Sequence, residues 1–181
     1  VSGIADGLYT LRLVSEDKAG LRGVMRITLT VDNTPPTAAV TTPAENGYVK
    51  QPLDVLGTAT DANLAGYKLE IAPGVKGAST RWSELGAGSV AVNNAALLAW
   101  QALPSDGVHT LRLTVRDKAE NMAEVLVQVN VDTHPPATPL GLKATVENRQ
   151  DVHLTWQTNS ETDVAGYAVY RDGARITPDL L

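Results

Sequence analysis

The stretch DGVHTLRL at residues 106–113 repeats DGLYTLRL at residues 6–13, a spacing of 100 residues. Each copy continues in the same register to Asp-Lys-Ala and then to Val-Asp-x-x-Pro-Pro, at residues 17–19 and 31–36 in the first copy and at residues 117–119 and 131–136 in the second. A match that holds its register over this length indicates a duplicated domain. A period of 100 residues is typical of one β-sandwich domain.

Alternating apolar and polar residues predict that each copy ends in a β-hairpin. Tyr9, Leu11 and Leu13 would share one face of a strand over residues 8–16, and the return strand covers residues 23–32. A hairpin alone is at best marginally stable, so the first one should be the last two strands of a domain. The Pro-Pro motif after each hairpin cannot donate to a ladder and predicts a short, semi-rigid link between domains.

We therefore predict an all-β chain of tandem β-sandwiches in three parts. Residues 1–33 are the C-terminal hairpin of an incomplete domain, residues 34–133 are a complete sandwich of about seven strands, and residues 134–181 are the N-terminal part of a third domain. Within the sandwich, the least regular stretch predicts three short strands, at residues 80–85, 89–92 and 95–101.

Composition narrows the classes of function. The net charge of −5 and the pI near 5.1 argue against a nucleic-acid partner, which would need a basic stripe, and against docking on an anionic membrane. There is no long apolar run, and hence no predicted membrane span in this segment. The chain has no cysteine, so no disulfide supports it. Phe is also absent, which leaves aliphatic residues to fill the core.

These motifs resemble the bacterial immunoglobulin-like domains that occur in tandem in large secreted and cell-surface proteins. The stretch DVAGYAVYRDG at residues 163–173, together with Leu142 and Trp156, resembles instead the first half of a fibronectin type III module. The resemblance implies tandem immunoglobulin-like and fibronectin type III-like sandwiches. In related sandwiches a tyrosine at the position of Tyr9 anchors a corner through its hydroxyl. The second copy has His109 there, which could do so through a ring nitrogen.

Acidic and amide residues at the domain links are the candidate metal ligands. Loops at the abutting ends of two sandwiches would gather one set at the first link, namely Asp32, Asn33, Asp61, Asn63, Asp117 and Asn121. Calcium prefers six to eight such oxygens, and a cation there would stiffen the string of domains. The alternative is that Asp and Asn simply form turns, which is the simpler interpretation because no EF-hand loop is present. Another set would meet at the second link, namely Asp132, Glu161 and Asp163.

No other pattern predicts a cofactor or catalysis. The histidines have no zinc-site spacing, no Gly-x-Ser-x-Gly elbow occurs, and no carboxylate pair is placed in a cleft. Trp100 and Trp156 are expected in cores. Trp82 is the candidate ligand-binding residue, since an exposed tryptophan can stack on sugars, although a core position is the alternative.

The sequence thus predicts a non-catalytic spacer or stalk segment of a large bacterial extracellular or surface protein, whose partners are the neighbouring domains of the same chain. One alternative is an adhesion module that binds a surface glycan or a protein. A second is a set of accessory domains in a multidomain secreted enzyme or toxin. Sandwich folds host many roles, so the fold alone does not choose among them.

Overall fold

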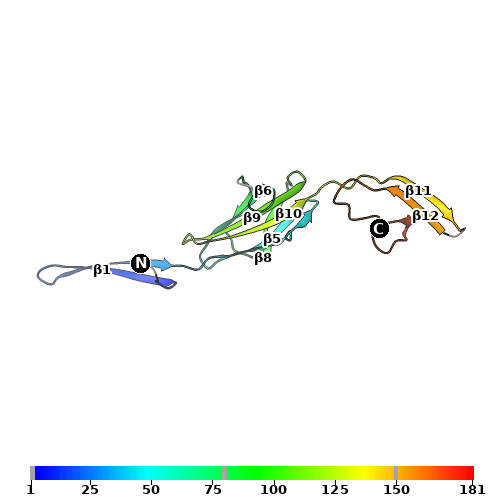
Figure 1. The fold of residues 1–181 in the computed structure, drawn as a ribbon. Helices are drawn as coiled ribbons and strands as arrows, with labels where there is room; N and C mark the ends of the chain where they lie inside the picture. Colours follow the sequence, from blue (N-terminus) through cyan, green and yellow to red (C-terminus); the bar gives the residue numbers. More distant parts are fainter. Residues whose placement is uncertain (1–2, 79–80, 149–150) are drawn as a thin grey trace. The chain divides into compact units, whose positions relative to one another are not determined.

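A computed structural model describes residues 3–78, 81–148 and 151–181 (Figure 1). These residues form strands and connecting loops, which confirms the prediction of an all-β chain. Within the same ranges, no helix is long and apolar enough to cross a membrane. The chain divides into two compact units, residues 1–133 and 134–181. The predicted domain boundaries, including the one at 33/34 inside the first unit, stay predictions.

The strands of the first unit are β1 Gly7–Glu16, β2 Arg22–Val31, β3 Thr37–Thr42, β4 Gly47–Val49, β5 Leu53–Thr60, β6 Leu64–Pro73, β7 Ser83–Gly88, β8 Val92–Trp100, β9 Gly107–Asp117 and β10 Met122–Val131. Strands β1 and β2 form a separate hairpin. The remaining strands form two sheets, one in the order β3-β5-β8 and one in the order β4-β10-β9-β6-β7. Figure 1 shows β9, β6 and β10 facing β5 and β8, the arrangement of a β-sandwich.

The core of the sandwich comes from alternate residues of the facing strands. Leu111, Leu113 and Val115 of β9 have no exposed surface, and the residues between them point to the other face of the sheet. Trp100 is buried among them, which confirms its predicted core position. Gly57 of β5 is needed here, because a Cβ at this position would collide with the backbone oxygen of Ala39 on β3.

The repeat seen in the sequence is also a repeat of strand register. In the hairpin the pairs run from Gly7↔Val31 to Glu16↔Arg22. In the sandwich the pairs between β9 and β10 run from Gly107↔Val131 to Arg116↔Met122, each residue being 100 positions later. Register is set by the turn and by the apolar pattern together, so both have been copied.

The loops and links of the two copies share their hydrogen bonds as well. Asp17 Oδ1 accepts the N–H groups of Ala19 and Leu21, and Asp117 Oδ1 accepts those of Ala119 and Asn121. At the start of each copy, an aspartate Oδ1 accepts the N–H of the residue that follows Val-Asp, in the pairs Asp6–Asn33 and Asp106–Thr133. The copied unit therefore includes the link.

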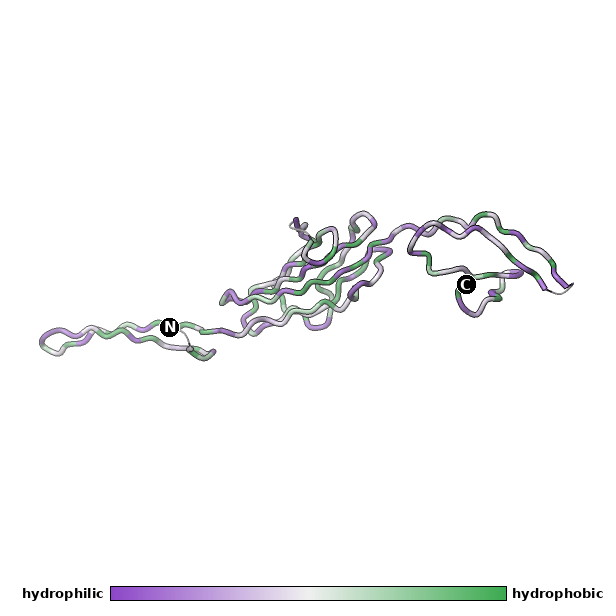
Figure 2. The backbone as a smooth tube through the Cα atoms, viewed as in Figure 1, coloured by the Kyte–Doolittle hydropathy of each residue, from purple (hydrophilic) through white to green (hydrophobic). Residues whose placement is uncertain are grey.

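The two copies differ in how much of their apolar face is covered. Leu11 is 53% exposed and Leu13 is 74% exposed, whereas Leu111 and Leu113 are fully buried beneath the second sheet. Figure 2 shows apolar stretches, in green, along the hairpin as well as along the strands of the sandwich. The apolar face of the hairpin is thus preformed but uncovered among the described residues.

The corner residues behave differently in the two copies. The Tyr9 hydroxyl donates to the backbone oxygen of Ala5 over 2.9 Å, as a corner tyrosine does. His109 is buried, and its Nδ1 lies 3.0 Å from the backbone oxygen of Gly107. The ring therefore does reach backbone, but two residues upstream instead of four.

The three short strands predicted near the middle of the sandwich were wrong in number. The structure has two, β7 at Ser83–Gly88 and β8 at Val92–Trp100, while Thr80 lies outside the described residues. Strand β7 continues through two glycines because side chains of neighbouring strands occupy the space that a Cβ would need, Leu98 at Gly86 and Tyr67 at Gly88. The short strand β4, which pairs in parallel with β10, was not predicted.

The second unit contains β11 Leu140–Glu147, β12 Asp151–Gln157, β13 Tyr170–Arg171 and β14 Ala174–Arg175. The pair Leu140↔Gln157 repeats Val40↔Gly57 at the same spacing of 100 residues. Trp156 is half-buried and meets Tyr167 edge to face, with ring centroids 5.3 Å apart. A groove of about 450 Å³ beside this pair is lined mainly by apolar side chains.

Candidate metal centre at the first domain link

Three aspartates from separate parts of the first unit meet at the link between the hairpin and the sandwich. Asp32 follows β2, Asp61 follows β5, and Asp117 ends β9. One carboxylate oxygen of each lies within 4.8 Å of those of the other two. Asp117 is fully buried, and the other two are half-buried. Strand ends at one end of a sandwich lie close together in space, which is why residues so distant in sequence converge.

The Asp117 carboxylate is held by its own loop. Its Oδ1 accepts the N–H groups of Ala119 and Asn121, at 2.9 and 2.8 Å, and its Oδ2 accepts the Asn121 side-chain amide at 2.7 Å. The same amide nitrogen lies 2.9 Å from the backbone oxygen of Asp32. Asn121 therefore joins the β9–β10 loop to the link.

Asn63 makes a similar connection from the β5–β6 loop. Its N–H donates to Asp61 Oδ1, and its side-chain amide donates to Asp32 Oδ2, both over 2.6 Å. Its backbone oxygen accepts the N–H of Lys118 over 2.9 Å, so the two loops also hold each other. Asn33 lies apart from this arrangement, because its side chain donates to Asp6 and to the backbone oxygen of Ile4.

The arrangement gathers oxygen ligands of the kind that hard cations prefer. Carboxylates and amide oxygens suit calcium, and three negative charges this close repel one another unless a cation or hydrogen bonds offset them. The structure brings together the predicted residues Asp32, Asp61, Asn63, Asp117 and Asn121, while Asn33 bonds to the hairpin. The amide groups of Asn63 and Asn121 present their nitrogens, so they act as donors to the carboxylates.

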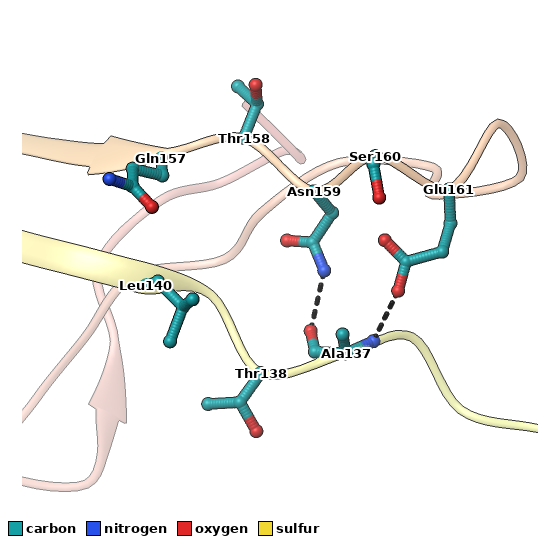
Figure 3. A pocket seen from close by; sticks show the side chains of 8 residues that line it. All are labelled: Ala137, Thr138, Leu140, Gln157, Thr158, Asn159, Ser160 and Glu161. Atoms are coloured by element: carbon teal, nitrogen blue, oxygen red, sulfur yellow. Dashed lines mark hydrogen bonds between the residues drawn. The ribbon is translucent and has the colours of Figure 1, made fainter.

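The second predicted set is divided between the two compact units. Within the second unit, Glu161 Oε1 accepts the N–H of Ala137 over 2.7 Å, and the Asn159 side chain donates to the backbone oxygen of Ala137 over 2.6 Å (Figure 3). The Ala137 N–H is the main cause of the lowered pKa of Glu161. These residues line a pocket of about 170 Å³. That Asp132 joins Glu161 and Asp163 stays a prediction.

Trp82, the candidate ligand-binding residue, packs on the ion pair between Arg112 and Glu70, on the outer face of the five-stranded sheet. It is half-buried, and the Arg112 guanidinium carbon lies 4.1 Å from the centre of its ring. Arg112 donates to Glu70 Oε2 from Nε at 2.9 Å and from Nη2 at 2.7 Å. Lys68 Nζ lies 2.7 Å from Glu70 Oε1. One face of the Trp82 ring is therefore already occupied by Arg112.

Sequence reasoning missed this ion pair. Glu70 is 6% exposed although it is charged, because it sits directly opposite Arg112 in the pairing of β6 with β9. The signal was present in the sequence, since the two residues are opposite charges at polar positions of an alternating strand, each between two apolar residues. It could be used only once β6 and β9 were known to be neighbours.

Comparison with known proteins gives local and distant likenesses. No family model matches the chain. A stretch of 48 residues, 25% of the chain, is 50% identical to a protein named "Alpha-amylase" from Niallia circulans, and it spans 4% of the length of that protein. The fibronectin(III)-like modules of CbhA from Clostridium thermocellum are 20% identical at a TM-score of 0.42, with 72% of this chain and 64% of theirs covered. The endo-beta-1,4-mannanase from Thermotoga petrophila is 13% identical at a TM-score of 0.38, with 57% of this chain and 21% of its own covered.

Proposed function

We propose that this chain is a non-catalytic spacer segment of a larger bacterial extracellular protein. One observation carries the proposal: the hairpin, its loop and the bonded link that follows it recur at a spacing of 100 residues with the same register and the same hydrogen bonds. A copied unit that includes the start of its link is suited to building a tandem array. Such an array suits the task of holding other domains at a distance.

The local match to an alpha-amylase supports a more specific form of the proposal. A segment that is half identical to a small part of a polysaccharide-degrading enzyme fits an accessory position in a multidomain secreted enzyme. The stacking of Arg112 on Trp82 favours this spacer role over a sugar-stacking role for that ring. In this form of the proposal, these residues are accessory and non-catalytic.

Stretching a single molecule tests the spacer role. With the chain held between two handles, we expect the sandwich to unfold in one abrupt step that releases roughly 300 Å of chain. About 100 residues extend to about 360 Å at about 3.6 Å each, and the length of the folded sandwich is subtracted from this. The antiparallel ladder between β9 and β10 is long and lies inside the sheet, so it should resist load as a unit. A gradual extension with no step would argue against a load-bearing spacer.

We further propose that the aspartates at the first link bind Ca²⁺ and thereby stabilise the link. Calcium at ten times its Kd is expected to stabilise the folded chain by about 1.4 kcal/mol relative to chelator. The measurement is the Tm with calcium and with EDTA. Asp61→Asn should remove most of the difference, because Asp61 supplies one of the three clustered carboxylates.

Asp17→Asn is the matched control for this experiment. Asp17 makes the same loop as Asp117, but it lies outside the cluster. It should leave the calcium effect intact. Equal Tm values with calcium and with EDTA in the unaltered protein would eliminate the calcium proposal and leave the turn-forming role of these residues.

A further inference from the structure

We infer that a hydrogen-bond lock on residues 32–34 fixes the hairpin against the sandwich, independently of any metal ion. The Asp6 side chain at the start of the hairpin holds this short segment on one side, and side chains from two loops of the sandwich hold it on the other. The lock builds on the proposed spacer function, because it says how the first link is kept stiff. It adds side-chain hydrogen bonds to the semi-rigid link that the Pro-Pro motif predicts.

The hairpin side of the lock is Asp6. Its Oδ1 accepts the N–H and the side-chain amide of Asn33, at 2.7 and 2.6 Å, and its Oδ2 accepts the Thr34 hydroxyl at 2.5 Å. These bonds lower the pKa of Asp6, with the Thr34 hydroxyl as the main cause. Val31, the residue before the segment, is already paired with Gly7 in the hairpin ladder. These bonds therefore fix the path of residues 32–34 relative to the hairpin.

The sandwich side of the lock consists of Asn63 and Asn121. Asn63 donates to Asp32 Oδ2 and Asn121 donates to the Asp32 backbone oxygen, from loops that also bond to each other through Lys118. Pro36, at the far end of the link, is buried in the sandwich. A rotation of the hairpin about the link must break both of the bonds to Asp32.

The first copy of the loop lacks one of these donors. The residue equivalent to Asn121 is Leu21, which is 71% exposed, while the backbone bonds of the two loops are the same. The asparagine is therefore not needed to form the loop. Its side-chain amide bonds to Asp117 within the loop and also donates to the Asp32 backbone oxygen, a contact to the link that the first copy of the loop cannot make.

The test is a distance measurement between two spin labels in the full chain. The chain has no cysteine, so cysteines placed at the exposed positions Arg12 in the hairpin and Gln101 in the sandwich label cleanly. Measurements are made in EDTA to exclude metal. We expect one narrow distance distribution for the parent protein and a broad one for the double variant Asn63→Ala/Asn121→Ala. Each lost hydrogen bond should raise the fraction of unlocked molecules roughly fivefold, and the loss of both should raise it roughly 30-fold.

Asn130→Ala is the matched control, since the Asn130 side chain donates to Asn46 inside the sandwich and lies outside the link. It should keep the narrow distribution. If the double variant does not fold, each single variant is compared with the parent protein, and each is expected to have a roughly fivefold higher unlocked fraction. A distribution as narrow as the parent's in variants that fold overturns the lock and leaves a stiff spacer standing. A broad distance distribution for the parent protein in EDTA also overturns the lock. If the distribution of the parent protein stays broad when calcium is added, the stiff spacer is overturned as well.

Discussion

Replacing Leu113 by alanine is expected to lower the free energy of unfolding of the sandwich by about 3 kcal/mol, within the usual range of about 2–5 kcal/mol for a buried leucine. Leu113 is fully buried, at the centre of β9, and its strand has a neighbour on each side. The lost methyl groups leave a cavity that two rigid sheets cannot close. Urea denaturation followed by tryptophan fluorescence measures the change, since Trp100 is buried in the same core.

The repeat supplies the control for this substitution. Leu13 occupies the equivalent position in the first copy, after the same three residues Thr-Leu-Arg, and it is 74% exposed. Leu13→Ala should therefore change the free energy of unfolding by no more than about 0.5 kcal/mol. A loss as large as that of Leu113→Ala would mean that the apolar face of the hairpin is covered in solution, contrary to the exposure described above.

The comparison of these two leucines also explains what the sequence could predict. Alternation identifies which residues share a face, and the copied motif identifies the hairpin and its register, as β1 with β2 and β9 with β10 confirm. Neither signal says whether a face is covered. That depends on strands from elsewhere in the chain, which is why equal patterns at Leu13 and Leu113 have opposite burial.

The clustering of aspartates at the first link was predicted from the expected strand topology and not from composition. The argument that loops meet at the abutting ends of two sandwiches placed Asp32, Asp61 and Asp117 together, as the structure has them. The same argument also placed Asn33 in this set, but the Asn33 side chain bonds to Asp6 and Ile4 at the start of the hairpin, a local contact that topology does not predict. The short pairing of β4 with β10 was equally out of reach, since three residues are too few to show a period.

Glu70→Gln is expected to cost about 2–3 kcal/mol of stability at neutral pH, the range for charge-assisted hydrogen bonds and partly buried ion pairs. The glutamine keeps the shape of Glu70 but not its charge. Among the described residues, the carboxylate left near the Arg112 guanidinium is then that of Glu124, at 4.0 Å. Asp54→Asn, at an exposed position on β5 in the other sheet, is the control and should be close to neutral.

The effect of Glu70→Gln should shrink as the solution becomes acidic. Burial by itself would raise the pKa of Glu70, but hydrogen bonds and charge from Lys68 and Arg112 outweigh it and hold the pKa below its ordinary value of 4.5. A carboxylate with a lowered folded-state pKa stabilises the protein fully above its unfolded pKa and loses that contribution as the pH falls through the folded one. Asp6, Glu45 and Glu161 also have lowered pKa values, but they are present in both proteins and cancel in the difference. Denaturation curves at pH 7 and at successive pH values below 4.5 therefore isolate Glu70, and a stability difference that stays constant over this range would contradict the ion pair.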